Sequence, residues 1–197
     1  MSRITRAVLA AGACVAALAG GVSAASAASA ASTASADEVA PQAAVAVAPK
    51  AVQLQLQHSG KCLTIPGGSL RNGVNAVQST CADDAENQVF DLVSVGSATF
   101  ELRAKHSGKC LDVENSGVKP GTAVQQWWCV DQPQQRWRMV MVDVVNELYE
   151  LRPAHALDQN RCLDIASASK DDDAKAQLWY CNGTAAQRWR IQPVKTA

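Results

Sequence analysis

Aromatic residues are scarce in this chain of 197 residues, and no Trp, Tyr or Phe lies within residues 1–51. Because large apolar groups are needed to form a core, only the remaining sequence can build a folded domain. The net charge is zero and no basic cluster stands out, which argues against nucleic acid as a partner. No Cys-x-x-Cys spacing occurs, which argues against zinc ligation by the cysteines. The length leaves little room for a large two-domain cofactor enzyme, and we expect no cofactor.

Residues 1–36 have the features of a secretory signal peptide. Two arginines and no acidic residue precede a small, apolar run at 7–19, and small-x-small triplets follow, so that cleavage is expected within 24–36. The run is shorter than the ~20 residues of a membrane-spanning helix, so we expect no membrane insertion after cleavage. Residues 37–51 are rich in Ala, Val and Pro without periodicity and indicate a linker. The sequence therefore predicts a secreted, extracellular protein that folds over 52–194.

The cysteines beyond the linker repeat one spacing. Cleavage of the signal peptide removes Cys14 and leaves an even number of cysteines in an oxidising compartment. Each first cysteine opens a Cys-Leu-Thr-Ile, Cys-Leu-Asp-Val or Cys-Leu-Asp-Ile phrase, and each repeat closes on Gln-x-aromatic. Three pairs share a separation of 19 residues, namely Cys62 and Cys81, Cys110 and Cys129, and Cys162 and Cys181. The chain therefore contains three internal repeats.

Short strands are expected throughout the repeats. Val52 and Leu54, and the corresponding pairs in the other repeats, alternate with polar residues at the period of a half-buried strand. Gly-rich or polar breaks such as Pro66-Gly67-Gly68 and Asn182-Gly183 separate these segments, and no convincing helical periodicity is present. The sequence therefore predicts an all-β fold, and a closed threefold arrangement would leave few exposed strand edges.

The repeated Cys-Leu-Asp phrases, the Gln-x-Trp-x-Cys segments and the terminal Gln-x-Trp motifs resemble the ricin B-chain-type lectins over residues 52–194. The resemblance implies a β-trefoil of three homologous lobes around a pseudo-threefold axis, with one potential carbohydrate site per lobe. The alanine-rich export signal is similar to those of high-GC bacteria. The expected lobes cover about 52–98, 99–146 and 147–194.

Pairing of the cysteines within each repeat is the simplest arrangement, and other pairings stay open at this stage. Each such disulfide would close a loop of about twenty residues and stabilise the fold by about 3 kcal/mol. The aromatic residues that close the repeats, Phe90, Trp137 and Trp189, are expected in the core.

Trp, Gln and Asp side chains provide the parts of a sugar site. A pyranose presents a C–H-rich face that stacks on an aromatic platform and a rim of hydroxyls that a carboxylate and amides can bind. The alternation of a strand puts Gln125 and Trp127 on one face, and Gln177 and Trp179 on another. The resemblance assigns these roles, of aromatic platform and of hydrogen-bonding group, to the same residues. The predicted carbohydrate-binding residues are Asp112, Gln125, Trp127, Gln134 and Gln135 in the second lobe and Asp164, Gln177, Trp179 and Gln187 in the third.

The three lobes match the pattern unequally. The first has Thr64 in place of Asp and, by our alignment, Thr80 in place of Trp, although it retains Gln78, Asn87 and Gln88; we expect it to be silent. The second is the most complete. The third has Ala186 where the family usually has Asn, which predicts weaker binding.

Two other clusters have structural and functional interpretations. His58, His106 and His155 occupy corresponding positions, and a metal cluster is less favoured for them than a role in turns. Asp171-Asp172-Asp173 lacks the alternating ligand pattern of a calcium loop and is better explained as a solvated loop. We therefore expect no metal site.

A catalytic function is disfavoured, because the repeated aspartates belong to separate lobes and would lie too far apart for glycoside hydrolysis. The leading hypothesis is a stand-alone, non-catalytic lectin that binds galactose-type sugars or a plant polysaccharide such as xylan through its second and third lobes. The alternative is a protein-binding or inhibitory β-trefoil that keeps the lectin scaffold. The sequence does not indicate an oligomeric state.

Overall fold

The computed structural model describes residues 50–194. Within this range the chain forms thirteen β-strands and seven short 3-10 helices, with no α-helix, so the predicted all-β class is confirmed. The first strand begins at Lys50, two residues before the predicted start of the fold, so the end of the predicted linker belongs to the sheet. The predicted signal peptide at 1–36 and the rest of the predicted linker lie outside the described residues. No helix in the described part is long and apolar enough to span a bilayer.

The three lobes share a succession of four strands and two 3-10 turns, to which the first lobe adds a two-residue strand and the third adds a further 3-10 helix. The first lobe comprises β1 (Lys50–Leu56), β2 (Cys62–Thr64), η1 (Pro66–Gly68), β3 (Val74–Asn75), β4 (Val77–Ser79), η2 (Glu86–Gln88) and β5 (Val89–Ser94). The second comprises β6 (Phe100–Ala104), β7 (Cys110–Val113), η3 (Glu114–Ser116), β8 (Val124–Trp127), η4 (Pro133–Gln135) and β9 (Arg136–Asp143). The third comprises β10 (Leu148–Pro153), η5 (Ala154–Gln159), β11 (Arg161–Ile165), η6 (Ala166–Ala168), β12 (Ala176–Tyr180), η7 (Ala185–Gln187) and β13 (Trp189–Pro193).

Six of these strands close into a barrel. The antiparallel pairs run from β1 to β5, β6, β9, β10 and β13, and β13 returns to β1. Each lobe contributes its first and last long strand to this ring. Closure satisfies the backbone donors and acceptors that an open sheet would leave at its edges.

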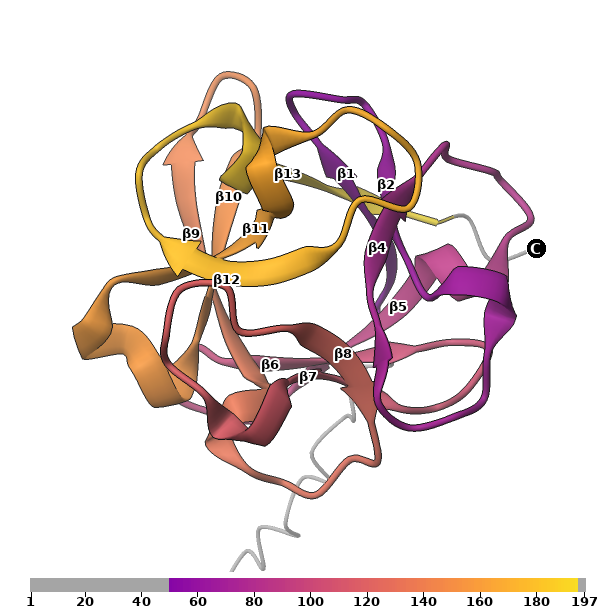
Figure 1. Cartoon of the computed structure of the whole chain (residues 1–197), viewed down its shortest axis with the longest axis horizontal. Coiled ribbons are helices and arrows are strands. Elements are labelled where there is room, and N and C mark those ends of the chain that lie inside the picture. The colour runs from indigo at the N-terminus through magenta and orange to yellow at the C-terminus, as the bar shows by residue number, and fades with distance from the viewer. Residues whose placement is uncertain (1–49, 195–197) are drawn as a thin grey trace, which may run out of the picture. The chain divides into compact units, whose positions relative to one another are not determined.

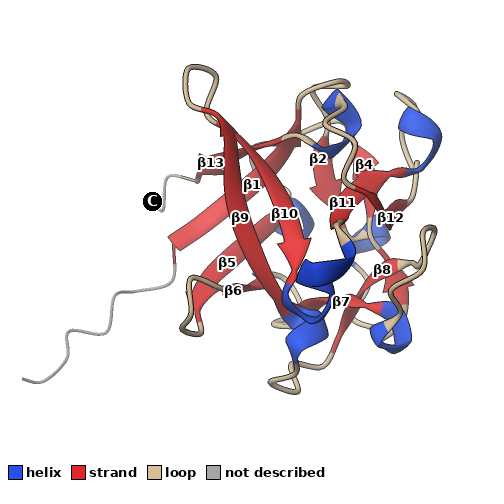
Figure 2. Cartoon of the chain, turned by 90° about the vertical axis from the view of Figure 1, so that its left-hand side faces the viewer, coloured by secondary structure: helices blue, strands red, loops and turns tan. Residues whose placement is uncertain are grey.

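Three two-stranded hairpins form a second layer beside the barrel. They are β2–β4, β7–β8 and β11–β12, one from each lobe. Figure 1 shows the three lobes around a common centre, and Figure 2 shows the hairpins on one side of the barrel strands. A barrel of six strands with one hairpin per lobe is the β-trefoil that the resemblance implied.

The closing aromatic residue of each repeat lies in the core, as predicted. Phe90, Trp137 and Trp189 have no solvent exposure and are the largest fully buried side chains. The indole N–H groups of both tryptophans are satisfied, since they donate to the backbone oxygens of Leu111 (3.0 Å) and Leu163 (3.3 Å) in the adjoining hairpin strands. These contacts tie each barrel strand to the hairpin of its own lobe.

The cysteines pair within each repeat. The bonds join Cys62 to Cys81, Cys110 to Cys129 and Cys162 to Cys181. In each lobe the first cysteine begins or lies within the first hairpin strand, and the second follows the other strand by one or two residues. The disulfides therefore hold the open ends of the hairpins together.

Candidate functional site

A hollow of about 400 Å³ lies over the second lobe's hairpin. Asp112 on β7 faces Gln125 on β8 in the strand register, and Trp127 follows on the same face of β8, as the alternation predicted. Trp127 is 39% exposed, so part of its ring is open to solvent. The hollow is lined by Gly73, Asp112, Glu114, Asn115, Ser116, Gln125, Trp127, Val130 and Gln134.

The carboxylate of Asp112 is fixed by two amide groups. Its Oδ1 accepts from Nε2 of Gln125 at 3.1 Å, and its Oδ2 accepts from Nε2 of Gln135 at 2.9 Å. Gln135 has no exposure, and its amide also bonds the backbone of Trp128 and Val130. The structure thus places Gln135 behind the carboxylate, outside the wall of the hollow, where it holds Asp112 in one orientation.

The third lobe repeats this arrangement. Oδ1 of Asp164 accepts from Gln177 at 2.8 Å, and Oδ2 accepts from the fully buried Gln187 at 3.0 Å. Trp179 is 39% exposed, the same fraction as Trp127. A hollow of about 380 Å³ is lined by Asp164, Ala166, Ser167, Ala168, Gln177, Trp179, Asn182, Thr184 and Ala186.

Burial raises the pKa of Asp112 and of Asp164 above the ordinary value of 3.8. The amide hydrogen bonds act in the opposite direction and lower the pKa of both groups, but the loss of hydration is the largest effect. A carboxylate in this setting gains from further hydrogen-bond donors, which makes it a suitable acceptor for ligand hydroxyl groups.

The two hollows differ at one predicted position. Gln134 lines the second-lobe hollow and offers an amide to it, whereas Ala186 occupies the corresponding place in the third. The rims differ too, because Glu114, Asn115 and Ser116 are replaced by alanine, serine and alanine. The second hollow therefore carries more hydrogen-bonding groups.

Two exposed aromatic residues next to the predicted platforms were not anticipated. Trp128 is 61% exposed and its ring lies against the ammonium of Lys109, 3.2 Å from the ring centroid. Tyr180 is 52% exposed and meets the ring of Trp179 edge to face at 6.3 Å. Their position next to a platform residue in the Gln-x-Trp-x-Cys segments was the only available signal.

Gly73, from the preceding lobe, was also missed, and nothing in its local sequence marks it.

The first lobe departs further from the pattern than our alignment indicated. In the hairpin register Thr64 faces Val77 and Cys62 faces Ser79, whereas the second lobe pairs Asp112 with Gln125. Val77 therefore stands in place of the site glutamine and Ser79 in place of the tryptophan. The placements of Gln78 and Thr80 at those positions were wrong by one residue.

Gln78 instead connects two lobes. Its amide donates to the backbone oxygens of Ser169 (2.8 Å) and Asp171 (2.7 Å) in the third lobe. Gln126 makes the equivalent bonds from the second lobe to Ser69 and Arg71 in the first. These glutamines lie on the strand face opposite the hollows.

The three histidines also act at lobe boundaries. Nε2 of His58 contacts the carbonyl oxygen of Ser169, and His106 and His155 make the same contact with Ser69 and Gly117, at 2.8 to 3.1 Å. No histidine belongs to a group of potential metal ligands within residues 50–194. The structure thus shows a turn-bridging role for each histidine.

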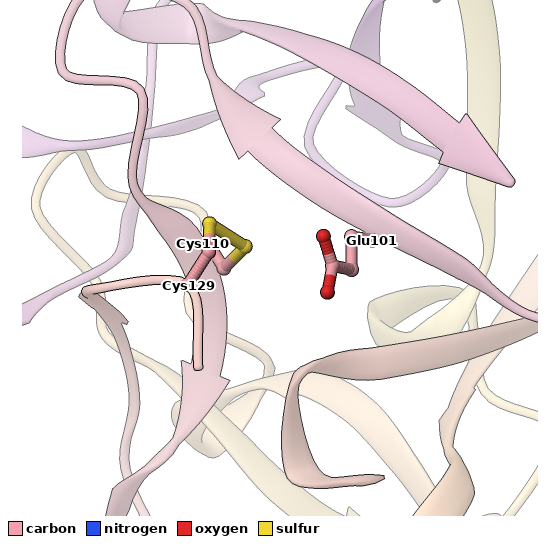
Figure 3. A group of neighbouring side chains, drawn as sticks. All are labelled: Glu101, Cys110 and Cys129. Atoms are coloured by element: carbon pink, nitrogen blue, oxygen red, sulfur yellow. A yellow bond between two sulfur atoms is a disulfide. The ribbon is translucent and has the colours of Figure 1, made fainter. Parts of the chain in front are cut away.

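The only groupings of three potential metal ligands in the described residues contain disulfide sulfurs. Figure 3 shows Glu101 beside the bonded pair Cys110 and Cys129, and Glu150 lies equivalently beside the third disulfide. A disulfide offers no thiolate to a metal, and Glu101 is already paired with Arg103 at 2.7 Å.

The triple-aspartate loop has a structural contact of its own. Oδ1 of Asp172 accepts from Nζ of Lys61 and from the backbone N–H of Thr80, both at 2.7 Å. These bonds hold the pKa of Asp172 below its ordinary value. The loop therefore fastens the third lobe to the first.

Two family models match the chain. The model described as ricin-type beta-trefoil lectin domain covers residues 98–197, and one described as ricin-type beta-trefoil lectin domain-like covers residues 42–127. The chain belongs to the ricin-type β-trefoil lectin family. The resemblance inferred from the sequence and the trefoil fold are thereby confirmed. A search of curated proteins finds no match.

Several solved structures have the same fold. The designed threefold-symmetric protein ThreeFoil is 33% identical with a TM-score of 0.67, and the alignment covers 72% of this chain and 97% of that protein. An exo-beta-1,3-galactanase from Clostridium thermocellum is 26% identical with a TM-score of 0.68; the alignment covers 74% of this chain but 30% of the enzyme. The Macrolepiota procera ricin B-like lectin, solved in complex with lactose, has the same fold at 17% identity and a TM-score of 0.63, over 74% of this chain and 96% of that lectin.

Proposed function

We propose that the protein is a secreted, non-catalytic lectin with two carbohydrate sites, in the second and third lobes, and a silent first lobe. The observation that carries this proposal is the combination, in each of two hollows, of a fixed carboxylate and a partly exposed tryptophan. Membership of the lectin family supports it.

The contacts suit a pyranose. Asp112 and Asp164 each present oxygens whose orientation is set by two amide donors, and the tryptophan of the same hollow offers a ring face. A sugar stacked on the ring would bring its hydroxyl groups to the carboxylate. Galactose-type sugars and xylan are the proposed ligands, because the resemblance implies them.

The first lobe lacks these parts. Thr64 is occupied by local bonds, since its hydroxyl donates to the carbonyl oxygen of Cys62 and accepts from the amide of Gln88. Val77 and Ser79 provide neither amide nor platform. The proposed binding therefore involves two lobes only.

Two carbohydrate sites on one rigid domain allow the protein to bind a polymer at two points at once. A shallow sugar site commonly has millimolar affinity, about −4 kcal/mol, and simultaneous engagement of two sites on a polymer raises the apparent affinity without new contacts. Polysaccharides are therefore expected to be retained more strongly than monosaccharides.

A screen of the purified full chain against a broad glycan and polysaccharide panel tests the proposal. The matched control is the double variant Asp112→Asn and Asp164→Asn, after its thermal stability has been compared with that of the parent. Binding that the double variant loses supports a two-site lectin and names its ligand class. No binding by the parent overturns the proposal.

One observation favours the alternative, a protein-binding trefoil. The turn between β9 and β10 exposes Val144 and Val145 at 76% and 91%, and Met141 in β9 is 46% exposed. Exposed apolar groups gathered at a hairpin tip are typical of interaction surfaces. A partner that binds there would be unaffected by substitution of Trp127 and Trp179.

A further inference from the structure

The wall of the second-lobe hollow crosses a lobe boundary. Gly73 belongs to the first lobe, immediately before β3, yet it lines the hollow that contains Asp112 and Trp127. Its backbone N–H donates to the carbonyl oxygen of Gln126 at 3.0 Å, and β3 pairs with β8 directly afterwards. These bonds hold the first-lobe backbone against the binding strand of the second lobe.

The lack of a side chain at position 73 keeps the tryptophan accessible. A Cβ atom there would lie 3.7 Å from Cζ3 of Trp127 and 3.8 Å from Oε1 of Gln125. These are ordinary van der Waals distances, so a methyl group would fit without a clash. It would, however, cover part of the ring that is otherwise open to the hollow.

The other lobe junctions provide an internal comparison. Gly121 and Asp173 make the same backbone bond as Gly73, to the carbonyl oxygens of Leu178 and Gln78. Asp173 has φ 65°, close to the 74° of Gly73, so this backbone conformation accommodates an aspartate. A Cβ at Gly121 would come no closer than 4.0 Å to Gln177 and would not touch a tryptophan.

We propose that Gly73 is a binding residue of the second-lobe site that keeps Trp127 accessible, and that a ligand bound there contacts the first lobe as well as the second. The first lobe is then silent in its own hairpin but completes its neighbour's site. This inference rests on the proposed carbohydrate binding. It predicts that side chains at position 73 exclude ligand from Trp127 in order of size, whereas position 121 is more tolerant.

The test measures the second site alone. Substitution Trp179→Ala removes the third-lobe platform, and Gly73→Ala and Gly73→Asp are then added separately. Affinity electrophoresis in gels that contain xylan or β-1,3-galactan measures retention. We expect about three- to tenfold weaker retention for Gly73→Ala, because part of the stacking surface is lost, and no retention for Gly73→Asp.

The matched control is Gly60→Ala and Gly60→Asp in the same background. Gly60 also has a positive φ, 69°, but a Cβ there would meet nothing within 4 Å, so these variants introduce the same backbone strain away from the hollow. Their retention is expected to equal that of the Trp179→Ala parent. A second readout is the amide resonance of Gly73, which should shift on titration of the parent with soluble xylan or galactan fragments.

The outcomes separate the inference from the proposed function. If the parent is retained and the variants at positions 73 and 60 behave alike, the role of Gly73 is refuted while carbohydrate binding stands. An unshifted Gly73 resonance at saturation refutes it equally. If the parent and the wild type bind no carbohydrate of the panel, the proposed function fails and this inference falls with it.

Discussion

Gln187 donates a hydrogen bond of 3.0 Å to Oδ2 of Asp164 from a position with no solvent exposure. The same amide donates to the carbonyl oxygen of Tyr180 and accepts from the backbone of Asn182. One buried side chain thus fixes both the carboxylate of the third hollow and the chain that follows its platform strand.

Substitution Gln187→Leu should weaken carbohydrate binding in the third lobe by about tenfold, although residue 187 does not line the hollow. The reason is the loss of a hydrogen bond to a charged acceptor, which leaves Gln177 as the one remaining amide donor of the two that orient Asp164. Titration calorimetry in a Trp127→Ala background would measure the affinity of the third-lobe site alone. Gln88→Leu is the matched control, because Gln88 is a buried glutamine that bonds Thr64 in the first lobe; a similar loss of affinity there would contradict the assignment.

An exchange at the position that differs between the hollows should redistribute affinity. Ala186→Gln is expected to strengthen the third site by about threefold to tenfold, and Gln134→Ala to weaken the second by a similar factor, through one hydrogen bond. The second lobe accommodates glutamine at this place, which makes the exchange structurally reasonable. Titration calorimetry measures each affinity separately when the tryptophan of the other hollow is replaced by alanine. Unchanged affinities would exclude positions 134 and 186 from the two sites.

Binding should be lost on acidification at a pH above 3.8, because burial raises the pKa of Asp112 and of Asp164 and protonation removes the acceptor. The contribution of these two carboxyl groups to folding stability has the opposite pH dependence. An acid with a raised pKa in the folded state binds its proton more readily there than in the unfolded chain, so these groups favour unfolding increasingly as the pH rises through 3.8 and the folded-state pKa. Retention measured between about pH 7 and pH 3 should show the first trend. The second should appear as the difference in thermal unfolding between the parent and the variant Asp112→Asn with Asp164→Asn over the same pH range.

Tryptophans in the hollows and in the core should respond differently to truncation. Trp127→Ala and Trp179→Ala together should abolish carbohydrate binding, whereas Trp137→Ala should destabilise the fold by roughly 3–5 kcal/mol, because its ring is fully buried and its N–H is bonded. Denaturant unfolding and the glycan panel measure the two effects. Capture of a protein partner that survives the double substitution would favour the protein-binding alternative.

The sequence by itself determined the repeat and the core aromatics, and it favoured the pairing of cysteines within each repeat that the structure confirms. Cys110 and Cys129 lie at the open end of one hairpin, formed by two neighbouring strands. Because the hairpin has the same length in each repeat, the two cysteines are separated by the same number of residues in every copy. The positions of the site aspartates and tryptophans could also be predicted from the sequence, because the alternation of side chains along a strand is a local property. The secretory segment and the linker before Lys50 remain predictions from composition.

Tertiary structure alone decided the burial of Gln135 and the contribution of Gly73. In the first lobe, the common spacing of 19 residues between the cysteines already aligns Val77 with Gln125, so the placement of Gln78 was an error of alignment. The strand pairing exposed this error, because a shift of one residue moves a strand side chain to the opposite face. The burial of Gln135 depends on the hairpin that covers it. Gly73 reaches Trp127 only because three lobes close around one barrel and bring the backbone of one lobe against the binding strand of the next, a contact that no local pattern encodes.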